Sequence, residues 1–316
     1  MIERDLVIVG GGPAGIAAGI SAHENGVKDI LLVERDQYLG GLLNQCVHTG
    51  FGLEYFKEIL TGPEYADRFV KKLLGIKNIE ISLRTFAVHL TKNKVLTCLA
   101  PGVMKEIRAR ALILATGCRE RTREMVHIPG TRPSGVFPAG LAQKLINIEG
   151  LLPGKEAVIV GSGDIGLIMA RRFTLEGAKV KAIIEIQKTS RGLIRNMVQC
   201  VEDFDIPVYF GHKVAKIHGM DRVEKVSVVR VDDDFNEVAG TEFDIECDTV
   251  LVSVGLIPEN ELLETAGNKT SILGLFVCGN SFKVYDLVDS VSKDSELAGK
   301  QAAEYLKRLG GLRKVR

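Results

Sequence analysis

The sequence predicts an α/β protein made of two related domains, and two observations carry this prediction. The stretch VIVGGGPAG at residues 7–15 returns as VIVGSGDIG at residues 158–166, so an apolar run and its glycine spacing are repeated 151 positions apart. The chain also has 316 residues, more than twice the length of an ordinary domain. A strand-turn-helix module that occurs twice in a chain of this length predicts one nucleotide-binding domain around each copy.

The elements around each copy form a βαβ unit. Around the first copy, Asp5–Val9 reads as a buried strand, Pro13 opens a helix, Gly26 ends it, and Asp29–Glu34 is the next strand. The second copy repeats this plan with a strand Ala157–Val160, a helix from Asp164 to about Glu176, a stop at Gly177 and a strand Lys179–Glu185.

Between the two copies the pattern changes from helix to antiparallel sheet. A helix begins at the capping-box sequence Thr61-Gly-Pro-Glu64, in which each polar side chain can bind the backbone N–H of the other residue. The alternating runs Ile79–Val88 and Val95–Leu99 predict an antiparallel meander. Arg110–Ala115 predicts a buried strand that stops at Thr116-Gly117.

After the second copy the pattern predicts a further series of helices and strands. The acidic run Asp232–Asp234 stands between two strands and is interpreted as a solvated turn rather than a metal site. In chain order we expect a helix over about Gly192–Phe204, a meander through Lys225–Val231 and Glu242–Cys247, a buried strand Thr249–Val254, a strand Leu275–Cys278 and a helix from about Asp286 to Arg308.

The glycine spacing has a physical reason. The first glycine permits the tight turn, the second lets the backbone approach a diphosphate, and the third lets helix and strand pack closely. The diphosphate then rests on the free N–H groups and the positive dipole end of the helix N-terminus. Glu34 lies 19 residues after Gly15, and Glu185 lies 19 residues after Gly166. A carboxylate at this position accepts hydrogen bonds from a ribose.

Two dinucleotide sites in one chain predict an electron path. One dinucleotide delivers a hydride and the other accepts it. We therefore expect a flavin dinucleotide at one site and a nicotinamide dinucleotide at the other.

The composition excludes several other classes of protein. The formal net charge is +1, without the basic excess of a nucleic-acid-binding protein. No stretch approaches the roughly 18 apolar residues of a membrane span, and no signal peptide precedes Gly10, so we expect a cytoplasmic protein. The six cysteines and six histidines form no local ligand cluster, which predicts reduced thiols and no metal site.

The order of the motifs resembles that of a known family. VIVGGGPAG, LILATG at 112–117, VIVGSGDIG, TVLVSVGLIP at 249–258 and GLFVCGN at 274–280 are similar to the pyridine nucleotide–disulfide reductase superfamily, at the size of its small, thioredoxin-reductase-like branch. The resemblance covers the whole chain. It implies two Rossmann-like domains of three layers (ββα), with FAD at the first glycine motif and NAD(H) at the second. It also implies a discontinuous FAD-binding domain, residues 1–120 and 255–316, into which the NAD-binding domain, residues 121–254, is inserted.

The chain departs from this family at the redox cysteines. Residues 40–48 read GGLLNQCVH, and Leu43 and His48 fall where the larger branch carries its two cysteines. The CxxC motif of the small branch is also missing, so we predict that the protein performs no dithiol chemistry. Cys46 is then either a small buried residue beside the flavin or a functional thiol. His48 is either a structural histidine or a proton donor.

Two further positions concern the flavin itself. Asn280 replaces the aspartate with which the family holds the ribityl chain, and its amide can still bind a hydroxyl. The resemblance places Leu287–Ser290 where the first turn of the last helix faces the flavin and stabilises negative charge on the reduced ring. Asp286 and Asp289 add negative charges of their own at this turn.

A narrower resemblance suggests the biological setting. GGLLNQCVHTGFG, ATGCRER and GTRPSGVFPAG are similar to flavoprotein subunits of opine oxidase, hydrogen-cyanide synthase and dye-linked proline dehydrogenase, and to proteins that accompany a glycerol-3-phosphate-dehydrogenase-like flavoprotein. This implies an FAD-dependent NADH dehydrogenase subunit of an oligomeric, multisubunit dehydrogenase. A second flavoprotein would oxidise the organic substrate, and a small iron–sulfur protein could join the two.

Two alternatives remain open at this point. One is a free-standing NADH:acceptor oxidoreductase that reduces a quinone, oxygen or a dye. The other is a structural FAD-binding subunit whose NAD site is vestigial.

The cofactor contacts are predicted residue by residue. No acid–base side chain is required for hydride transfer, so Cys46 and His48 are the only catalytic candidates, and no metal ligand is predicted. The predicted NAD(H) contacts are Gly161, Gly163, Asp164, Ile165, Glu185 and Gly255. The predicted FAD contacts are Gly10, Gly12, Pro13, Ala14, Gly15, Glu34, Arg35, Gly41, Leu42, Leu43, Asn44, Val88, Ala115, Thr116, Gly117, Gly279, Asn280, Leu287 and Val288.

Overall fold

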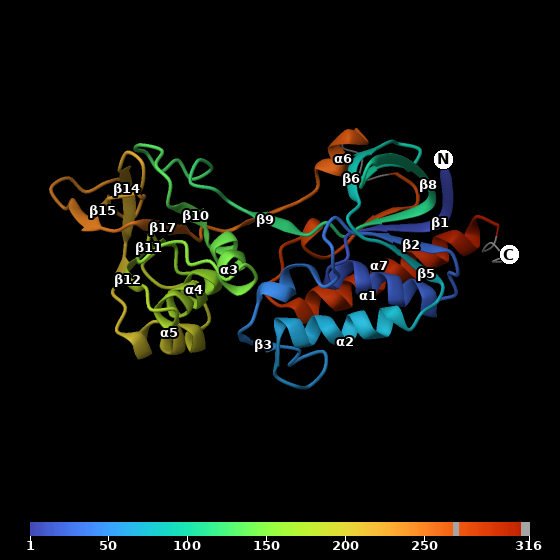
Figure 1. The fold of residues 1–316 in the computed structure, drawn as a ribbon, viewed down its shortest axis with the longest axis horizontal. Helices are drawn as coiled ribbons and strands as arrows, with labels where there is room; N and C mark the ends of the chain where they lie inside the picture. The colour runs from blue at the N-terminus through green and yellow to red at the C-terminus, as the bar shows by residue number, and fades with distance from the viewer. Residues whose placement is uncertain (268–271, 311–316) are drawn as a thin grey trace. The chain divides into compact units, whose positions relative to one another are not determined.

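The chain folds into two compact units. The computed structural model describes residues 1–267 and 272–310. Unit 1 comprises Met1–Arg119 and Ile257–Arg316, and unit 2 comprises Glu120–Leu256 (Figure 1). The chain leaves unit 1 through strand β9 (Cys118–Glu120) and returns through strand β18 (Leu256–Pro258), which pairs with β9.

Unit 1 is built on a sheet whose strands run in the order β5-β2-β1-β8-β7-β6, with β19 also paired to β8. The long strand β8 pairs in parallel with β1 over residues 107–114, while its other edge pairs first with β7 and then with β19. The strands are β1 (Ile2–Val9), β2 (Ile30–Val33), β3 (Thr49–Phe51), β4 (Leu60–Thr61), β5 (Ile79–Ser82), β6 (Phe86–Leu90), β7 (Val95–Ala100), β8 (Val103–Leu114) and β19 (Leu275–Val277). The helices are α1 (Pro13–Glu24), α2 (Gly62–Leu74), α6 (Glu261–Thr265) and α7 (Val288–Arg308), with the short 3-10 turns η1 (Gly41–Gln45) and η3 (Gly279–Ser281).

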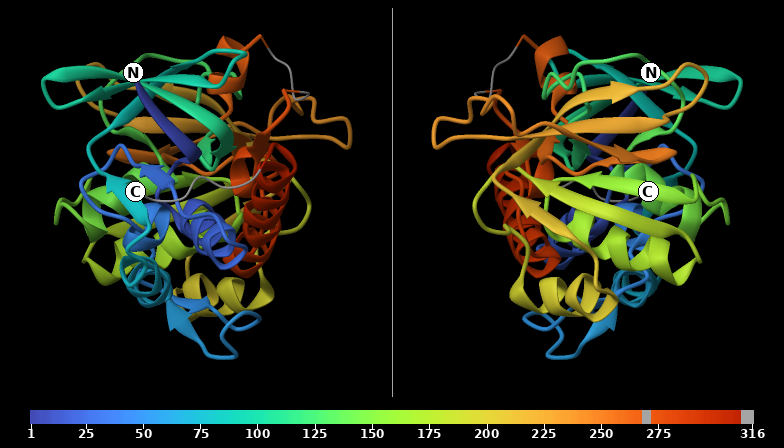
Figure 2. Two further views of the ribbon diagram at one scale, coloured as in Figure 1. Left: turned by 90° about the vertical axis from the view of Figure 1, so that its right-hand side faces the viewer. Right: turned by 90° about the vertical axis from the view of Figure 1, so that its left-hand side faces the viewer.

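Unit 1 has three layers because the parallel strands of its sheet are apolar on both faces. Successive residues of each strand point to opposite faces, and each face is covered. Leu6 and Ile8 of β1 pack against helices α1, α2 and α7, whereas Val7 and Val9 pack against the β6–β8 meander. The blue α1 and the red α7 lie side by side in the left view of Figure 2. They approach closely at Gly299, where a Cβ atom would lie 2.2 Å from the carbonyl oxygen of Ala18.

Unit 2 repeats the three-layer plan on a parallel sheet ordered β10-β17-β11-β12-β13. One face carries α3, α4 and α5, and the antiparallel sheet β14-β15-β16 covers the other. The strands are β10 (Val136–Pro138), β11 (Glu156–Val160), β12 (Lys179–Glu185), β13 (Val208–Phe210), β14 (His212–His218), β15 (Lys225–Arg230), β16 (Phe243–Glu246) and β17 (Thr249–Val252). The helices are α3 (Ala139–Asn147), α4 (Asp164–Leu175) and α5 (Ile194–Cys200), followed by the 3-10 turn η2 (Glu202–Phe204). The predicted α/β class with two three-layer, Rossmann-like folds is therefore confirmed.

Several local predictions hold, and two are wrong. The capping box of α2 is present, with Thr61 and Glu64 bonded to each other's backbone N–H. The segment 79–82 is not part of the meander, because β5 pairs in parallel with β2. The helix expected over 192–204 is shorter: it begins at Ile194, ends at Cys200, and Val201 leaves the helical conformation at φ −127°.

No helix in the described ranges 1–267 and 272–310 is both long and apolar enough to cross a membrane.

Candidate dinucleotide-binding sites

The first glycine loop joins β1 to α1, and its three glycines play different parts. Gly10 has φ +111°, and a Cβ there would lie 2.3 Å from the carbonyl oxygen of Ala115 on the neighbouring strand. A Cβ at Gly15 would lie 1.8 Å from the carbonyl oxygen of Gly10. At Gly12 the nearest atom to a Cβ is the Cα of Gly41, at 3.8 Å. The protein itself therefore requires Gly10 and Gly15, whereas Gly12 leaves room for something else.

The second glycine loop, between β11 and α4, has the same division of roles. A Cβ at Gly161, where φ is +98°, would lie 2.1 Å from the carbonyl oxygen of Ser253, and one at Gly166 would lie 2.6 Å from that of Gly161. Around Gly163 no atom lies within 4 Å of a Cβ position. In both loops the middle glycine could thus carry a Cβ without a clash, and that of the second loop faces open space.

Helix N-termini supply the donors at both open positions. Gly12 and Gly163 are the N-cap residues of α1 and α4, and neither makes a side-chain capping bond. The first N–H groups of a helix have no partner within the helix, and they coincide with the positive end of its dipole. A diphosphate fits this combination of free N–H groups and a glycine without a side chain.

A buried acid stands beside each loop, as the spacing predicted. Glu34 is 7% exposed, and its carboxylate accepts N–H bonds from Gly11 at 2.5 Å and Asp36 at 2.7 Å. Glu185 is 5% exposed. It accepts from the Ser162 N–H at 2.7 Å, the Ser162 hydroxyl at 2.6 Å and the Gln187 N–H at 2.8 Å.

Both acids therefore hold the glycine loop in shape, a role that sequence reasoning missed. The spacing alone assigned Glu34 and Glu185 only to a ribose. A carboxylate offers about four lone-pair positions, so each retains acceptor capacity for a ligand hydroxyl. Ser162 was also missed, because it occupies a variable position of the glycine motif.

The segment after β2 approaches the first loop. The Gly40 N–H donates to the Gly11 carbonyl at 2.8 Å, and a Cβ at Gly41 would lie 2.9 Å from the Cα of Gly12. Leu43 is buried at 5% exposure. The neighbouring Asn44 amide instead bonds the Leu39 carbonyl at 2.9 Å. The predicted contact Gly41 thus lies at the open position of the loop, whereas Arg35 and Leu42 are exposed.

Cys46 and His48 lie at the end of this segment. Cys46 is 8% exposed, and its thiol donates to the Leu42 carbonyl at 3.4 Å. Burial raises the pKa of the Cys46 thiol to about 12. His48 is half-buried and packs against Phe51, with ring centroids 5.1 Å apart. A thiol with this pKa stays protonated at neutral pH, which disfavours it as a nucleophile.

Two other segments of unit 1 meet beside the first loop. A Cβ at Gly279 would lie 2.8 Å from the Cβ of Ala14, which places η3 against the start of α1. The Gly117 N–H donates to the Ser281 hydroxyl at 2.8 Å, and the Thr116 hydroxyl lies 3.1 Å from the same oxygen. Ser281 is a further residue that sequence reasoning missed, because it belongs to no motif.

The remaining predicted residues are more scattered. Asn280 accepts from the Tyr285 N–H at 3.0 Å and donates to the Cys118 sulfur at 3.5 Å. Leu287 and Val288 are the N-cap and first residue of α7. Val88 lies on β6 at 44% exposure, three residues beyond Thr85, whose N–H donates to the Glu34 carbonyl at 2.8 Å. In unit 2, Gly255 has φ +107° and Ile165 packs partly buried in the helix-side core.

Asp289, in the first turn of α7, is buried at 3% exposure. Its carboxylate accepts N–H bonds from Tyr55 at 2.8 Å and Gly52 at 3.3 Å. This acid therefore fastens the segment before β4 to the start of α7.

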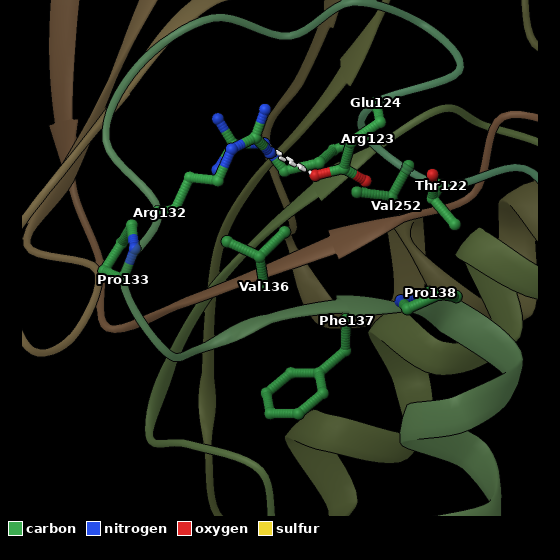
Figure 3. A pocket seen from close by; sticks show the side chains of 9 residues that line it. All are labelled: Thr122, Arg123, Glu124, Arg132, Pro133, Val136, Phe137, Pro138 and Val252. Atoms are coloured by element: carbon green, nitrogen blue, oxygen red, sulfur yellow. Dashed lines mark hydrogen bonds and ion pairs between the residues drawn. The ribbon is translucent and has the colours of Figure 1, made fainter.

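A cavity of about 230 Å³ lies in unit 2, at the ends of β10 and β17. Figure 3 shows Arg132 reaching the Glu124 carboxylate, with which it forms an ion pair. The Arg123 guanidinium donates to the backbone carbonyls of Thr131, Ile128 and Pro129. These charges are already compensated within the protein. None of the predicted cofactor contacts lies in the lining, which comprises Thr122, Arg123, Glu124, Arg132, Pro133, Val136, Phe137, Pro138 and Val252.

The family model described as "Pyridine nucleotide-disulphide oxidoreductase" matches residues 4–283. The chain belongs to this family. It is a family of FAD- and NAD(P)H-binding flavoproteins, and the two glycine loops provide the donors and the space that such cofactors need. The cofactors of the chain are accordingly FAD and a nicotinamide dinucleotide, and the protein is an oxidoreductase.

Individual relatives fall in different branches of the family. The HcnB subunit of hydrogen cyanide synthase from Pseudomonas protegens is 27% identical over 83% of the chain, and an opine oxidase subunit from Agrobacterium tumefaciens is 23% identical over 98%. The matched regions are 58% and 64% of those relatives, so the chain spans about six tenths of their length. Dihydrolipoyl dehydrogenase from Acholeplasma laidlawii is 30% identical over 84% of the chain and 82% of that enzyme.

A solved structure supports the fold alone. Thioredoxin reductase from Lactococcus lactis superposes with a TM-score of 0.76 at 19% identity, covering 96% of this chain and 99% of that one.

Proposed function

We propose that the protein is an FAD-dependent NAD(H) oxidoreductase in which unit 1 holds FAD and unit 2 holds NAD(H). One observation carries the proposal: in each unit the middle glycine of the loop, at a helix N-terminus and beside a buried acid, has room for a Cβ that the protein does not fill. Such a site takes a diphosphate and the adjoining ribose. Two of these sites in one member of this family support a reaction between two dinucleotides.

The surroundings of the two loops support the assignment of cofactors. The first loop has additional walls, because Gly41 packs on Gly12 and Gly279 packs on Ala14. These segments suit the longer, ribityl-containing half of FAD. The second loop is covered by one short segment after β12, which suits a smaller dinucleotide.

The chain's own residues bind and orient in this proposal. When bound, FAD supplies an acceptor for the hydride of NADH. Glu34 and Glu185 each fix a glycine loop and offer spare lone pairs to a ribose. Gly12 and Gly163 admit the diphosphates to the N–H groups of α1 and α4. No acid–base side chain is assigned, because hydride transfer needs none.

We further propose that the enzyme is of the non-disulfide type. Leu43 and His48 take the places of the redox cysteines of the larger branch, and Leu43 is a buried hydrocarbon side chain. Cys46 is buried with a raised pKa, whereas dithiol exchange needs an accessible thiolate. Electrons would then leave the flavin for a partner or a small acceptor rather than for a disulfide.

For the partner we propose a second flavoprotein, resembling glycerol-3-phosphate dehydrogenase, that oxidises the organic substrate. Support comes from relatives that are named as subunits, such as those of hydrogen cyanide synthase and opine oxidase. An iron–sulfur relay would be supplied by a further small protein.

NADH turnover by the purified chain, loaded with FAD and given an artificial dye, tests the proposal. We expect turnover that saturates with NADH. Failure to oxidise NADH while FAD stays bound would refute the enzyme and favour a structural subunit with a vestigial NAD site. Affinity purification from the native cell then separates a multisubunit enzyme, which brings down a second flavoprotein, from a free-standing NADH:acceptor oxidoreductase, which does not.

A further inference from the structure

A short segment of unit 2 folds back across the second glycine loop. We call residues 190–196, which follow β12 and end in the first turn of α5, the strap. Its Gly192 N–H donates to the Ser162 carbonyl at 3.0 Å, and the Ser190 hydroxyl donates to the same oxygen at 2.9 Å. Two donors from the strap therefore converge on one carbonyl of the glycine loop.

Asp164 makes the second attachment. It is the first residue of α4 and directly follows the open position at Gly163. Its Oδ1 accepts from the Leu193 N–H at 2.8 Å and from the Asn196 side-chain amide at 2.7 Å. The same carboxylate oxygen thus holds the end of the strap and the first turn of α5.

The strap packs closely on the glycine loop at Gly192. A Cβ at Gly192 would lie 2.5 Å from Leu167 Cδ1, 3.1 Å from the Ser162 carbonyl oxygen and 3.1 Å from Asp164 Oδ1. A side chain at residue 192 would push the strap off the loop. The strap is therefore seated beside the N-terminus of α4, where a diphosphate would bind.

The negative charge of Asp164 disfavours a direct contact with a phosphate. An acid favours a helix N-terminus but repels an anion that binds at the same end. The first loop has Pro13 at the matching position and no acid there. On the strap, by contrast, Arg191 and Arg195 are exposed cations. The sequence predicts Asp164 as an NAD(H) contact, but its observed bonds go to Leu193 and Asn196 of the strap.

We propose that Asp164 is a positioning residue for the nucleotide: it fastens the strap beside the adenosine-diphosphate half of NAD(H) and does not itself bind the ligand. This inference rests on the proposed function for the identity of the nucleotide. The strap carries Arg191 next to Gly192, so fastening it fixes a positive charge near the diphosphate. Because the adenosine-diphosphate half lies far from the reacting nicotinamide carbon, loosening the strap changes KM and leaves kcat.

Hydrogen exchange of the purified protein without nucleotide tests the attachment alone. In Asp164→Ala the backbone amides of the strap, that of Leu193 above all, should exchange faster than in wild type. Asp164→Asn keeps an Oδ1 acceptor and should retain most of the protection. Glu176→Ala, which removes an acid just beyond the other end of α4, is the matched control and should leave the strap unchanged. Unaltered exchange in Asp164→Ala would overturn the inference.

Calorimetry with ADP-ribose, a fragment that lacks the nicotinamide, tests the consequence. Asp164→Ala should weaken binding by about tenfold, the effect of one or two lost hydrogen bonds, and should raise the KM for NADH by a similar factor. Asp164→Asn should bind at least as tightly as wild type, because it keeps the attachment and loses a negative charge. Equal losses in both variants, with normal exchange in both, would show that Asp164 binds the nucleotide directly and overturn the inference. If wild type fails to bind ADP-ribose, the proposed function fails with it, and the exchange data then show separately whether the attachment exists.

Discussion

Alanine substitution at Gly163 should change the stability of the fold little, whereas alanine substitution at Gly161 of the same loop should lower it strongly. Alanine at Gly163 meets no atom within 4 Å, and the backbone there, at φ −70° and ψ 165°, suits any residue. Gly163→Ala therefore costs only the preference for glycine over alanine at an N-cap, about 0.5–1 kcal/mol. Gly161→Ala puts a Cβ 2.1 Å from a backbone oxygen at φ +98°, and we expect a loss of about 2–4 kcal/mol.

Gly163→Ala should nevertheless weaken the binding of NADH. In the proposed site, a methyl group at residue 163 would fill the space through which phosphate oxygens reach the N–H groups of α4. One charge-assisted hydrogen bond is worth about 1.5–3 kcal/mol, so Gly163→Ala should weaken NADH binding by about 10- to 100-fold. Thermal unfolding followed by circular dichroism measures the first effect, and isothermal titration with NADH measures the second.

Two results would refute this reasoning. Wild-type affinity for NADH in Gly163→Ala would mean that the diphosphate does not rest at the open glycine. Wild-type stability in Gly161→Ala would mean that the close approach to Ser253 does not constrain the loop.

Three further predictions concern the other sites. Gly12→Ala, whose Cβ meets only the Gly41 Cα at 3.8 Å, should fold normally but lose visible flavin absorbance during gel filtration; retained flavin would contradict the assignment of the first loop. Cys46→Ala should keep NADH-to-dye activity, and iodoacetamide should label Cys46 slowly in native protein at neutral pH because its pKa is raised to about 12; loss of activity with FAD still bound would reveal a working thiol. Wild type should prefer NADH over NADPH by roughly a hundredfold in kcat/KM, since a 2′-phosphate would face the Glu185 carboxylate, and Glu185→Gln should reduce that preference by about tenfold; equal use of both nucleotides by wild type would exclude the assignment of Glu185.

The βαβ units could be predicted because local physics fixes them. Pro13 at a helix start, Gly26 and Gly177 at positive φ after helix ends, and the Thr61–Glu64 capping box act within a few residues of the chain. The positive φ angles of Gly10 and Gly161 belong to the same local turns, although the neighbouring strands at Ala115 and Ser253 also exclude a side chain there. The acids Glu34 and Glu185 could be found by spacing because strand length sets where the next strand ends.

Other features depend on contacts between distant segments. The strand at 79–82 carries the same alternation as the meander strands, and only its pairing with β2 decides its direction. The helix α5 starts late because Gly192 and Leu193 donate their N–H groups to Ser162 and Asp164, which lie 30 and 29 residues earlier in the chain. The short helix α3 was not predicted at all, since its start depends on the Glu120 carboxylate bonding the N–H groups of Gly140 and Leu141.

The packing of α7 on α1 has a consequence for synthesis of the protein on the ribosome. The Ser21 hydroxyl donates to the Glu296 carbonyl at 2.7 Å, and Gly299 packs against Ala18. The first helix of unit 1, α1, is therefore covered by the last helix, α7. Unit 2, residues 120–256, is made in between and holds its own core. At about 5–20 residues per second, some 10–30 s separate residue 119 from the start of α7 at Val288. During that interval unit 2 can fold, whereas the face of α1 that α7 covers in the native protein stays exposed until α7 has been made.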